Sequence, residues 1–266
     1  MTDMLQLNGK RFLVFGVANR KSVAYAIGRQ LSATGAVCDY VVRDETIRRR
    51  VTPLLDGAFV ECCDLTDDRQ IEALRAALAA RGARYDGLVH SVAMAEYQDG
   101  PVPFHETPRA AFLRAIDVSC FSLLAICNAL KDLLDTDASV VTISISTTRM
   151  ASESYGYMAP IKAALESSLA FLAKSFSRFS RVRFNAVAPG LLKTSASAGI
   201  PGYVDAYLYA EQVIPRKQAV RTEEAATVAV FLLSPCSSGI NAQTIVVDAG
   251  MSINYFDRDV IKKVVG

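Results

Sequence analysis

Tyr155 and Lys162 stand seven positions apart in a run of small and apolar residues. At about 100° per residue, seven helical steps bring the lysine within about 20° of the tyrosine, so both side chains would face one ligand if the helix is regular. An ammonium group beside a phenol lowers the phenol pKa from about 10, which suits proton donation. Tyr157 lies about 140° from Lys162 and would point elsewhere. The alternative is an interface tyrosine and a surface lysine, and Pro160 predicts that the helix begins near Ala159 or kinks there.

A candidate phosphate-binding turn follows the first apolar run. Gly16 permits a tight turn, Ala18 lets the backbone approach a pyrophosphate, and Ser22 can cap a helix that begins at Val23 and whose amides attract anions. The segment lacks a GxGxxG pattern, and an ordinary strand-to-helix connection has the same features. The interpretation therefore depends on residues at the ends of the following strands.

Arg43 ends the second apolar run, where an acid would pair with the ribose of NAD and an arginine would accept the phosphate of NADP. Arg43 favours NADPH. NADH is the alternative, because Asp44 is unfavourable for a phosphate and because Arg48–Arg50 fit a solvated helix face equally well. Asp64 ends the third run and can accept from an adenine amino group, or serve as a helix cap or turn residue.

Strand-like runs alternate with segments of helical period along the whole chain. Their Val- and Ile-rich composition predicts an α/β fold: a single-domain, Rossmann-type, doubly wound parallel sheet of about seven strands with helices on both faces, spanning residues 1–266. The segment 191–215 has no clear period and follows a strand end, so we expect a substrate-covering loop. The expected strands are Arg11–Phe15, Val37–Val42, Ala58–Cys62, Gly87–Ser91, Ser139–Ile145, Arg181–Ala188 and Thr244–Val247.

The composition argues against several classes of function. A formal charge of +2 over 266 residues does not suggest a nucleic-acid partner. The first residues lack a long apolar stretch, no run of 18 uncharged apolar residues occurs, and the cysteines form no CxxC pair, so we expect a cytoplasmic protein without a membrane anchor. His90 and His105 have no partner at metal or triad spacing, so structural roles and no metal site are expected.

At these residues the chain resembles the enoyl-acyl-carrier-protein reductase branch of the short-chain dehydrogenase/reductases. The discriminating feature is the Tyr-x6-Lys spacing, because most short-chain dehydrogenases have Tyr-x3-Lys and Met158 stands at that position here. The resemblance covers nearly the whole chain. Its other segments are Gly9–Arg11, Gly16–Ala18, Ser22–Ala24, Cys63–Asp64, Tyr85–Gly87, Val89–Ala93, Asp117–Ser119, Asn185–Val187, Gly190 and Val247–Asp248.

The resemblance implies reduction of the carbon–carbon double bond of a trans-2-enoyl thioester by NAD(P)H, on an acyl carrier protein or coenzyme A. Tyr155 would hydrogen-bond the thioester carbonyl, as a preorganised donor to the developing enolate. Lys162 would bind the nicotinamide ribose, and Ala95 and Met158 would join Tyr155 at the substrate. The implied cofactor contacts, besides Ala18, Arg43 and Lys162, are Gly16, Ser22, Val23, Asp64, Leu65, Ser91, Val92, Ala93, Leu192 and Thr194.

The chain also departs from that family's pattern. Ile145 stands where the family often has a second tyrosine, and Ala249 stands where it usually has glycine. Ala188–Gly190 resembles the ordinary short-chain dehydrogenases, and Pro160 is also unusual for the family. These departures suggest a divergent member in fatty-acid synthesis or a specialised pathway. They keep open a carbonyl reductase or alcohol dehydrogenase and, as a weaker alternative, a non-catalytic dinucleotide-binding protein. The apolar surfaces of the expected helices 107–134 and 159–179 predict a homo-oligomer, and the family implies a homotetramer.

Overall fold

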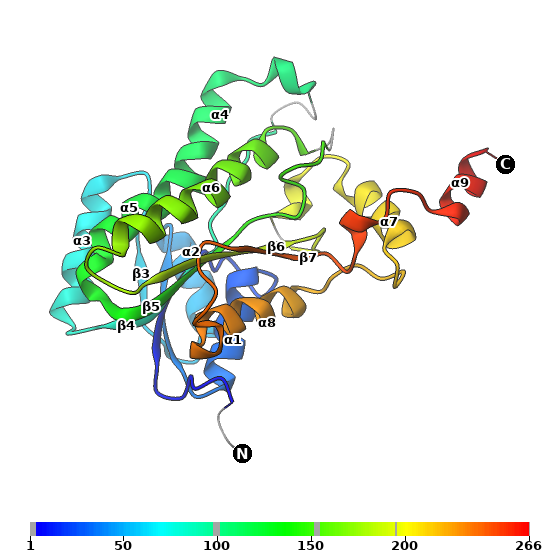
Figure 1. Ribbon diagram of the computed structural model, residues 1–266. Coiled ribbons are helices and arrows are strands. Elements are labelled where there is room, and N and C mark those ends of the chain that lie inside the picture. Colours follow the sequence, from blue (N-terminus) through cyan, green and yellow to red (C-terminus); the bar gives the residue numbers. More distant parts are fainter. Residues whose placement is uncertain (1–3, 98–101, 152–154, 195, 266) are drawn as a thin grey trace.

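The computed structural model describes residues 4–97, 102–151, 155–194 and 196–265 and contains one parallel sheet (Figure 1). Its seven strands lie in the order β3-β2-β1-β4-β5-β6-β7, which confirms the predicted Rossmann-type architecture. The strands are β1 (Arg11–Phe15), β2 (Val37–Val42), β3 (Val60–Cys62), β4 (Tyr85–His90), β5 (Leu134–Ile143), β6 (Arg183–Pro189) and β7 (Thr244–Val247).

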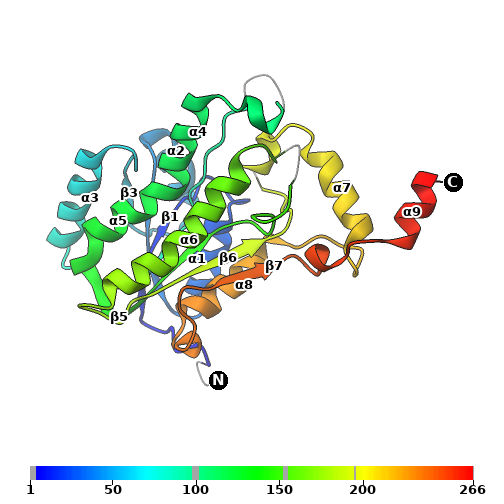
Figure 2. The same cartoon turned by 45° about the horizontal axis from the view of Figure 1, so that its top comes forward.

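Helices cover both faces of this sheet, as Figures 1 and 2 show. Helices α1 and α8 pack on one face, and α3, α5 and α6 lie on the other, while α7 and α9 lie beyond the end of β7. The helices are α1 (Val23–Ala33), α2 (Glu45–Val51), α3 (Asp68–Ala80), α4 (Arg109–Ile116), α5 (Ser122–Leu130), α6 (Met158–Phe176), α7 (Tyr203–Val213), α8 (Thr222–Leu233) and α9 (Arg258–Val265).

Burial on both faces explains why the strands are apolar without alternation. Along β1, Leu13 and Phe15 join the core under α3, α5 and α6. Phe12 and Val14 point the other way and join the core under α1 and α8. All four side chains are at most 1% exposed. The sheet therefore separates two apolar cores and holds its carboxyl edge rigidly.

Two expectations about helices were wrong in detail. The segment 107–134 is interrupted: a five-residue π-turn at Asp117–Phe121 separates α4 from α5. The segment 191–215 is not a structureless loop, because it contains the eleven-residue helix α7. One described helix, Arg109–Leu133 with its π-turn, is long and apolar enough to cross a membrane by length and composition. Its Leu123, Ile126 and Cys127 are fully buried in the core of this fold.

The turn after β7 contains a strained residue. The Asp248 carboxylate accepts hydrogen bonds from the backbone amides of Gly250 at 2.9 Å and Ser252 at 2.8 Å. Ala249, between them, has φ +55, in the left-handed region that favours glycine. An L-residue there costs roughly 1–2 kcal/mol.

We expect Ala249→Gly to raise the free energy of unfolding by about 0.5–1 kcal/mol, because relief of the strain exceeds the extra chain entropy of glycine. Chemical denaturation measures this change. Ala58→Gly, at a residue that is not among those with positive φ, is the control and should not stabilise. Equal effects of the two substitutions would contradict the strain at Ala249.

Candidate active site

The order of the strands reverses between β1 and β4, and ligands of open α/β sheets bind at the carboxyl edge at such a point. Gly16 and Ser91 follow these two strands directly. Gly16 has φ +98, and a Cβ there would overlap the backbone oxygen of Ser91. Only glycine lets the two strand ends approach so closely, and the backbone is then open to a pyrophosphate.

Ser22 organises the turn between β1 and α1 in a way that differs from the expected helix cap. Its hydroxyl oxygen accepts hydrogen bonds from the backbone amides of Ala18, at 3.0 Å, and Asn19, at 3.1 Å. Among the described residues it makes no capping bond to α1, although it occupies the N-cap position. The turn is thus folded back on Ser22, directly before α1, and the N-terminus of a helix attracts anions through its first amides.

The polar residues that follow β2 and β3 form hydrogen bonds within the chain. Arg43 is exposed, and its Nε donates to the Asp44 carboxylate at 2.9 Å. Asp44 also caps α2 by accepting from the Ile47 amide at 2.9 Å. Asp64 Oδ1 accepts from the amide and hydroxyl of Thr66, which fits a turn residue, while its Oδ2 has no partner among the described residues. Leu65 is 8% exposed and packs in the core.

The segment after β4, which includes Ser91, Val92, Ala93 and Ala95, is held by hydrogen bonds from the π-turn and from the residue that precedes α6. Ser119, in the π-turn, accepts from the Met94 amide at 2.9 Å and donates to the Met94 carbonyl at 3.3 Å. Tyr157 accepts from the Glu96 amide at 2.8 Å and donates to the Glu96 carbonyl at 2.9 Å. π-Turns are frequent at functional sites, where they redirect a side chain.

His90 has the structural role expected of it. Its imidazole is fully buried, with Nδ1 2.9 Å from the Thr142 hydroxyl and Nε2 2.9 Å from the Ser122 hydroxyl. Burial lowers the pKa of His90 to about 3, so the ring is neutral at physiological pH.

Tyr155 and Lys162 do not share a regular helix, which corrects the angular argument from the sequence. Helix α6 begins at Met158, and Gly156 has φ +55, so Tyr155 lies before the regular α-helix that contains Lys162. Pro160 is the third residue of α6, where the missing amide hydrogen costs no intrahelical bond.

The expected lowering of the phenol pKa is also wrong. Desolvation raises the pKa of Tyr155, and the neighbouring phenols of Tyr97 and Tyr203 raise it further. The Tyr155 hydroxyl is therefore protonated at physiological pH and available as a hydrogen-bond donor.

Lys162 is 3% exposed, and its Nζ donates to the carbonyl of Ile143, the last residue of β5, at 2.7 Å. Desolvation lowers the pKa of Lys162 to about 8, and the nearby Cys120 and Glu166 oppose this shift. The Glu166 carboxylate accepts from Ser144 at 2.5 Å and from Thr148 at 3.2 Å. An ammonium group at the end of β5 fits the hydroxyl groups of a ribose.

The residues after β6 are tied together by short contacts. The Leu192 carbonyl accepts from Ser197 Oγ and from Tyr203 Oη, both at 2.8 Å. The Thr194 amide donates to Ser197 Oγ at 2.9 Å. Leu192 is 4% exposed, so its backbone faces this network while its side chain lies in the core. Met158 is likewise 4% exposed and packs in the core, which leaves little of its side chain for a substrate.

The sequence from residue 16 to residue 252 matches the family model described as Enoyl-(Acyl carrier protein) reductase. The chain belongs to this family. The enoyl-acyl-carrier-protein reductase [NADH] of Nostoc sp. is 34% identical over 257 residues, which cover 94% of this chain and 99% of that protein. The Escherichia coli enzyme of the same description is 31% identical over 252 residues, covering 93% and 95%.

Solved structures of this reductase family agree with the fold. The Aquifex aeolicus enoyl-acyl-carrier-protein reductase (NADH) has a TM-score of 0.90 at 30% identity, covering 94% of this chain and 99% of that chain. The Bacillus cereus enzyme, solved with NADP+ and indole naphthyridinone, has a TM-score of 0.88 at 30% identity, covering 93% and 98%.

Three polar residues near Tyr155 or Lys162 were not predicted from the sequence, namely Tyr97, Glu166 and Tyr203. Glu166 had one available signal, because it lies four residues after Lys162 and so on the same face of α6. Tyr97 and Tyr203 lie in stretches without period, and only the fold brings their phenols close to Tyr155.

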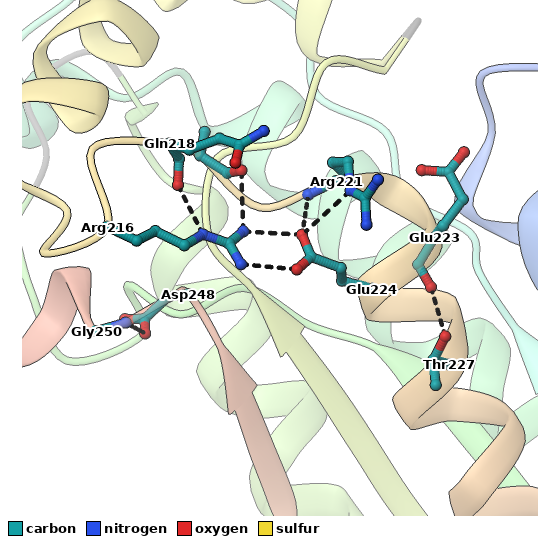
Figure 3. Close-up of polar contacts among 9 residues, drawn as sticks. Arg216, Gln218, Arg221, Glu223, Glu224, Thr227, Asp248 and Gly250 are labelled. Atoms are coloured by element: carbon teal, nitrogen blue, oxygen red, sulfur yellow. Dashed lines mark hydrogen bonds and ion pairs between the residues drawn. The ribbon is translucent and has the colours of Figure 1, made fainter.

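An ion-pair network joins the end of the segment 191–215 to α8 (Figure 3). Arg216 binds both carboxylate oxygens of Glu224, at 2.7 and 2.8 Å, and donates to the carbonyls of Gln218 and Ala219. Glu224 also accepts from the Arg221 amide at 2.8 Å. Two hydrogen bonds lower the pKa of Glu224 to about 2: the larger effect comes from the Arg216 side chain and the smaller from the Arg221 amide.

A carboxylate whose pKa falls from 4.5 to about 2 on folding stabilises the fold above pH 4.5, and this stabilisation is lost as the pH falls towards 2. We therefore expect Glu224→Gln to lower the free energy of unfolding at pH 7 by about 1 kcal/mol and to flatten its acid dependence. Denaturation between pH 7 and pH 2 measures both effects. Glu72→Gln, which breaks the exposed pair with Arg75, is the control. An acid dependence equal to that of the wild type would contradict this role of Glu224.

Proposed function

We propose that the protein reduces the carbon–carbon double bond of a trans-2-enoyl thioester in fatty-acid synthesis, using a nicotinamide dinucleotide. The main support is a protonated phenol, Tyr155, just before α6, and a buried ammonium group, Lys162, within α6 that donates to the end of β5, in a chain of the enoyl reductase family. The relatives named above are themselves called enoyl-acyl-carrier-protein reductases.

A bound nicotinamide dinucleotide would supply a hydride to the β-carbon of the substrate. As the double bond is reduced, negative charge develops on the thioester oxygen, and the Tyr155 hydroxyl donates a hydrogen bond to it. Such a preorganised donor can lower the barrier by several kcal/mol. Because its high pKa keeps Tyr155 protonated, the phenol acts as a donor and not as a base. A solvent proton completes the reduction at the α-carbon.

The proposed dinucleotide contacts follow the strand ends. Gly16, Ala18, Ser22 and Val23 would hold the pyrophosphate, and Lys162 the nicotinamide ribose. Asp64, through its unpartnered Oδ2, and Leu65 would contact the adenine. Ser91–Ala93, Leu192 and Thr194 would line the nicotinamide half. Ala95, with the small exposed part of Met158, would border the substrate beside Tyr155.

We propose NADH as the preferred cofactor, in place of the NADPH that Arg43 alone suggests. The named relatives are NADH enzymes, and the Arg43 guanidinium is already paired with Asp44, whose carboxylate would repel a ribose phosphate. NADPH is the alternative, because the B. cereus structure contains NADP+.

Arg43→Ala should therefore change the NADH:NADPH ratio of kcat/KM by less than about threefold. Steady-state kinetics with both cofactors measures the ratio, with Arg69→Ala, at an exposed arginine on α3, as the control. A tenfold or larger loss of kcat/KM with NADPH alone corresponds to about 1.4 kcal/mol. That result would instead mean that Arg43 binds the ribose phosphate of NADPH.

The carrier, assembly and location are part of the proposal. We propose an acyl carrier protein as the thioester carrier, with coenzyme A thioesters as smaller substrates, and a cytoplasmic location. We propose one domain over residues 1–266, in which residues 191–215 cover the substrate. Exposed apolar side chains on α4, the π-turn and α6, namely Leu113, Phe121 and Phe171, favour a homotetramer, which sedimentation equilibrium would test.

Tyr155→Phe should lower kcat for a short trans-2-enoyl thioester at least a hundredfold, because it removes the donor to the enolate oxygen, while NADH affinity changes little. NADH oxidation and fluorescence titration measure the two quantities. Turnover at the wild-type rate would contradict the role of Tyr155.

Carbonyl reduction is the second candidate function, favoured by Ile145 and by the sequence Ala188–Gly190. Turnover of carbonyl compounds without turnover of enoyl thioesters would support it. Cofactor binding without turnover of either class would instead support a non-catalytic dinucleotide-binding protein.

A further inference from the structure

The turn that carries Tyr155 is held by a tyrosine from the segment after β4. Tyr97 Oη donates to the backbone carbonyl of Tyr155 at 3.2 Å. The Tyr97 ring stacks on the Tyr157 ring, with centroids 6.2 Å apart and planes 21° apart. A Cβ built on Gly156 would lie 3.6 Å from the Tyr97 ring, so that ring also covers the backbone of Gly156.

Among the residues that the structure describes, few contacts within this turn fix its conformation. Gly156 has φ +55, and α6 begins only at Met158, so the helix does not orient Tyr155. Glycine in such a turn leaves the chain more freedom than any other residue would. Contacts from outside the turn must therefore fix the direction of the Tyr155 side chain.

Tyr97 is itself firmly placed. The neighbouring Glu96 is bound through its backbone by Tyr157 and through its carboxylate by Arg114, at 3.2 Å. Phe112 also packs against Tyr157, with ring centroids 6.1 Å apart. The segment after β4 and the turn 155–157 thus form one packed unit.

We propose that Tyr97 is a positioning residue that fixes the Tyr155 phenol for donation to the substrate oxygen. The inference rests on the proposed function. Ile145 offers no hydroxyl from the end of β5, so the described phenols that affect Tyr155 come from Tyr97 and Tyr203. Of these two, Tyr97 contacts the backbone of the turn itself, whereas Tyr203 Oη donates to Leu192.

Removal of one hydroxyl separates positioning from packing. Tyr97→Phe keeps the ring stack and removes the hydrogen bond, so kcat should fall about fivefold with KM for the thioester within twofold, a change of about 1 kcal/mol in the barrier. Tyr97→Leu also removes the stack, and kcat should fall about fiftyfold, because small misplacements of a catalytic group are costly. With NADH deuterated at the transferred position, the isotope effect on kcat should rise in both variants.

Tyr40→Phe is the matched control. Tyr40 is a buried phenol that packs on Gly28 of α1, across the sheet from α6, so this variant also loses a buried hydroxyl. Its kcat and isotope effect should equal those of the wild type, whatever its thermal stability. A Tyr97→Phe variant with wild-type kcat, or with a loss of thermal stability alone, would overturn the inference.

A readout without turnover keeps the inference separate from the proposed function. In protein labelled with 13Cζ-tyrosine, the Tyr155 resonance is assigned by its absence in Tyr155→Phe. It should shift or broaden in Tyr97→Phe and stay unchanged in Tyr40→Phe. If the wild type reduces no enoyl thioester, the proposed function fails, and a Tyr155 resonance unaffected by Tyr97→Phe would overturn the positioning role as well.

Discussion

The close approach of the ends of β1 and β4 is the constraint on which the site depends. Gly16 leaves no room for a side chain beside the Ser91 carbonyl, so the two strands can separate only beyond this point. The phosphate-binding turn and the segment 91–97 then diverge from a fixed origin at the edge where the strand order reverses. Ser22 folds the first of these and Ser119 the second, through hydrogen bonds to their backbones. The shape of this edge of the sheet is thus set by backbone geometry more than by particular side chains.

The chemistry at this edge depends on a balance between burial and charge. The spacing of Tyr155 and Lys162 predicted an ammonium group that lowers the phenol pKa, but desolvation raises it. Desolvation also lowers the pKa of Lys162 to about 8, so the lysine is still mainly charged at neutral pH. Both groups are therefore protonated where the enzyme would work. A protonated phenol suits stabilisation of an enolate, whereas an alcohol dehydrogenase needs a tyrosine that can also accept a proton.

The elements of the fold could be predicted from the sequence where burial alone decides the structure. The strands β1, β2 and β7 were predicted with their observed bounds, because their side chains are packed on both sides or end at clear turn residues. β5 begins at Leu134, five residues before the predicted start, because the exposed Thr136 and Asp137 interrupt the apolar run without ending the pairing. Helix α7 was missed because its apolar residues mark no clear stripe. Tyr97 could not be found at all, since its role arises from contact with a turn 58 residues further along the chain.

The departures from the family pattern do not all strain the backbone. Pro160 is harmless in the first turn of α6, but Ala249 is strained, and such strain tends to persist where surrounding structure or function requires it. A Cβ on the adjacent Gly250 would lie 3.3 Å from Pro215, so this turn supports the end of the segment 191–215. The turn that holds the strained Ala249 therefore also supports the segment 191–215, which is the segment proposed to cover the substrate.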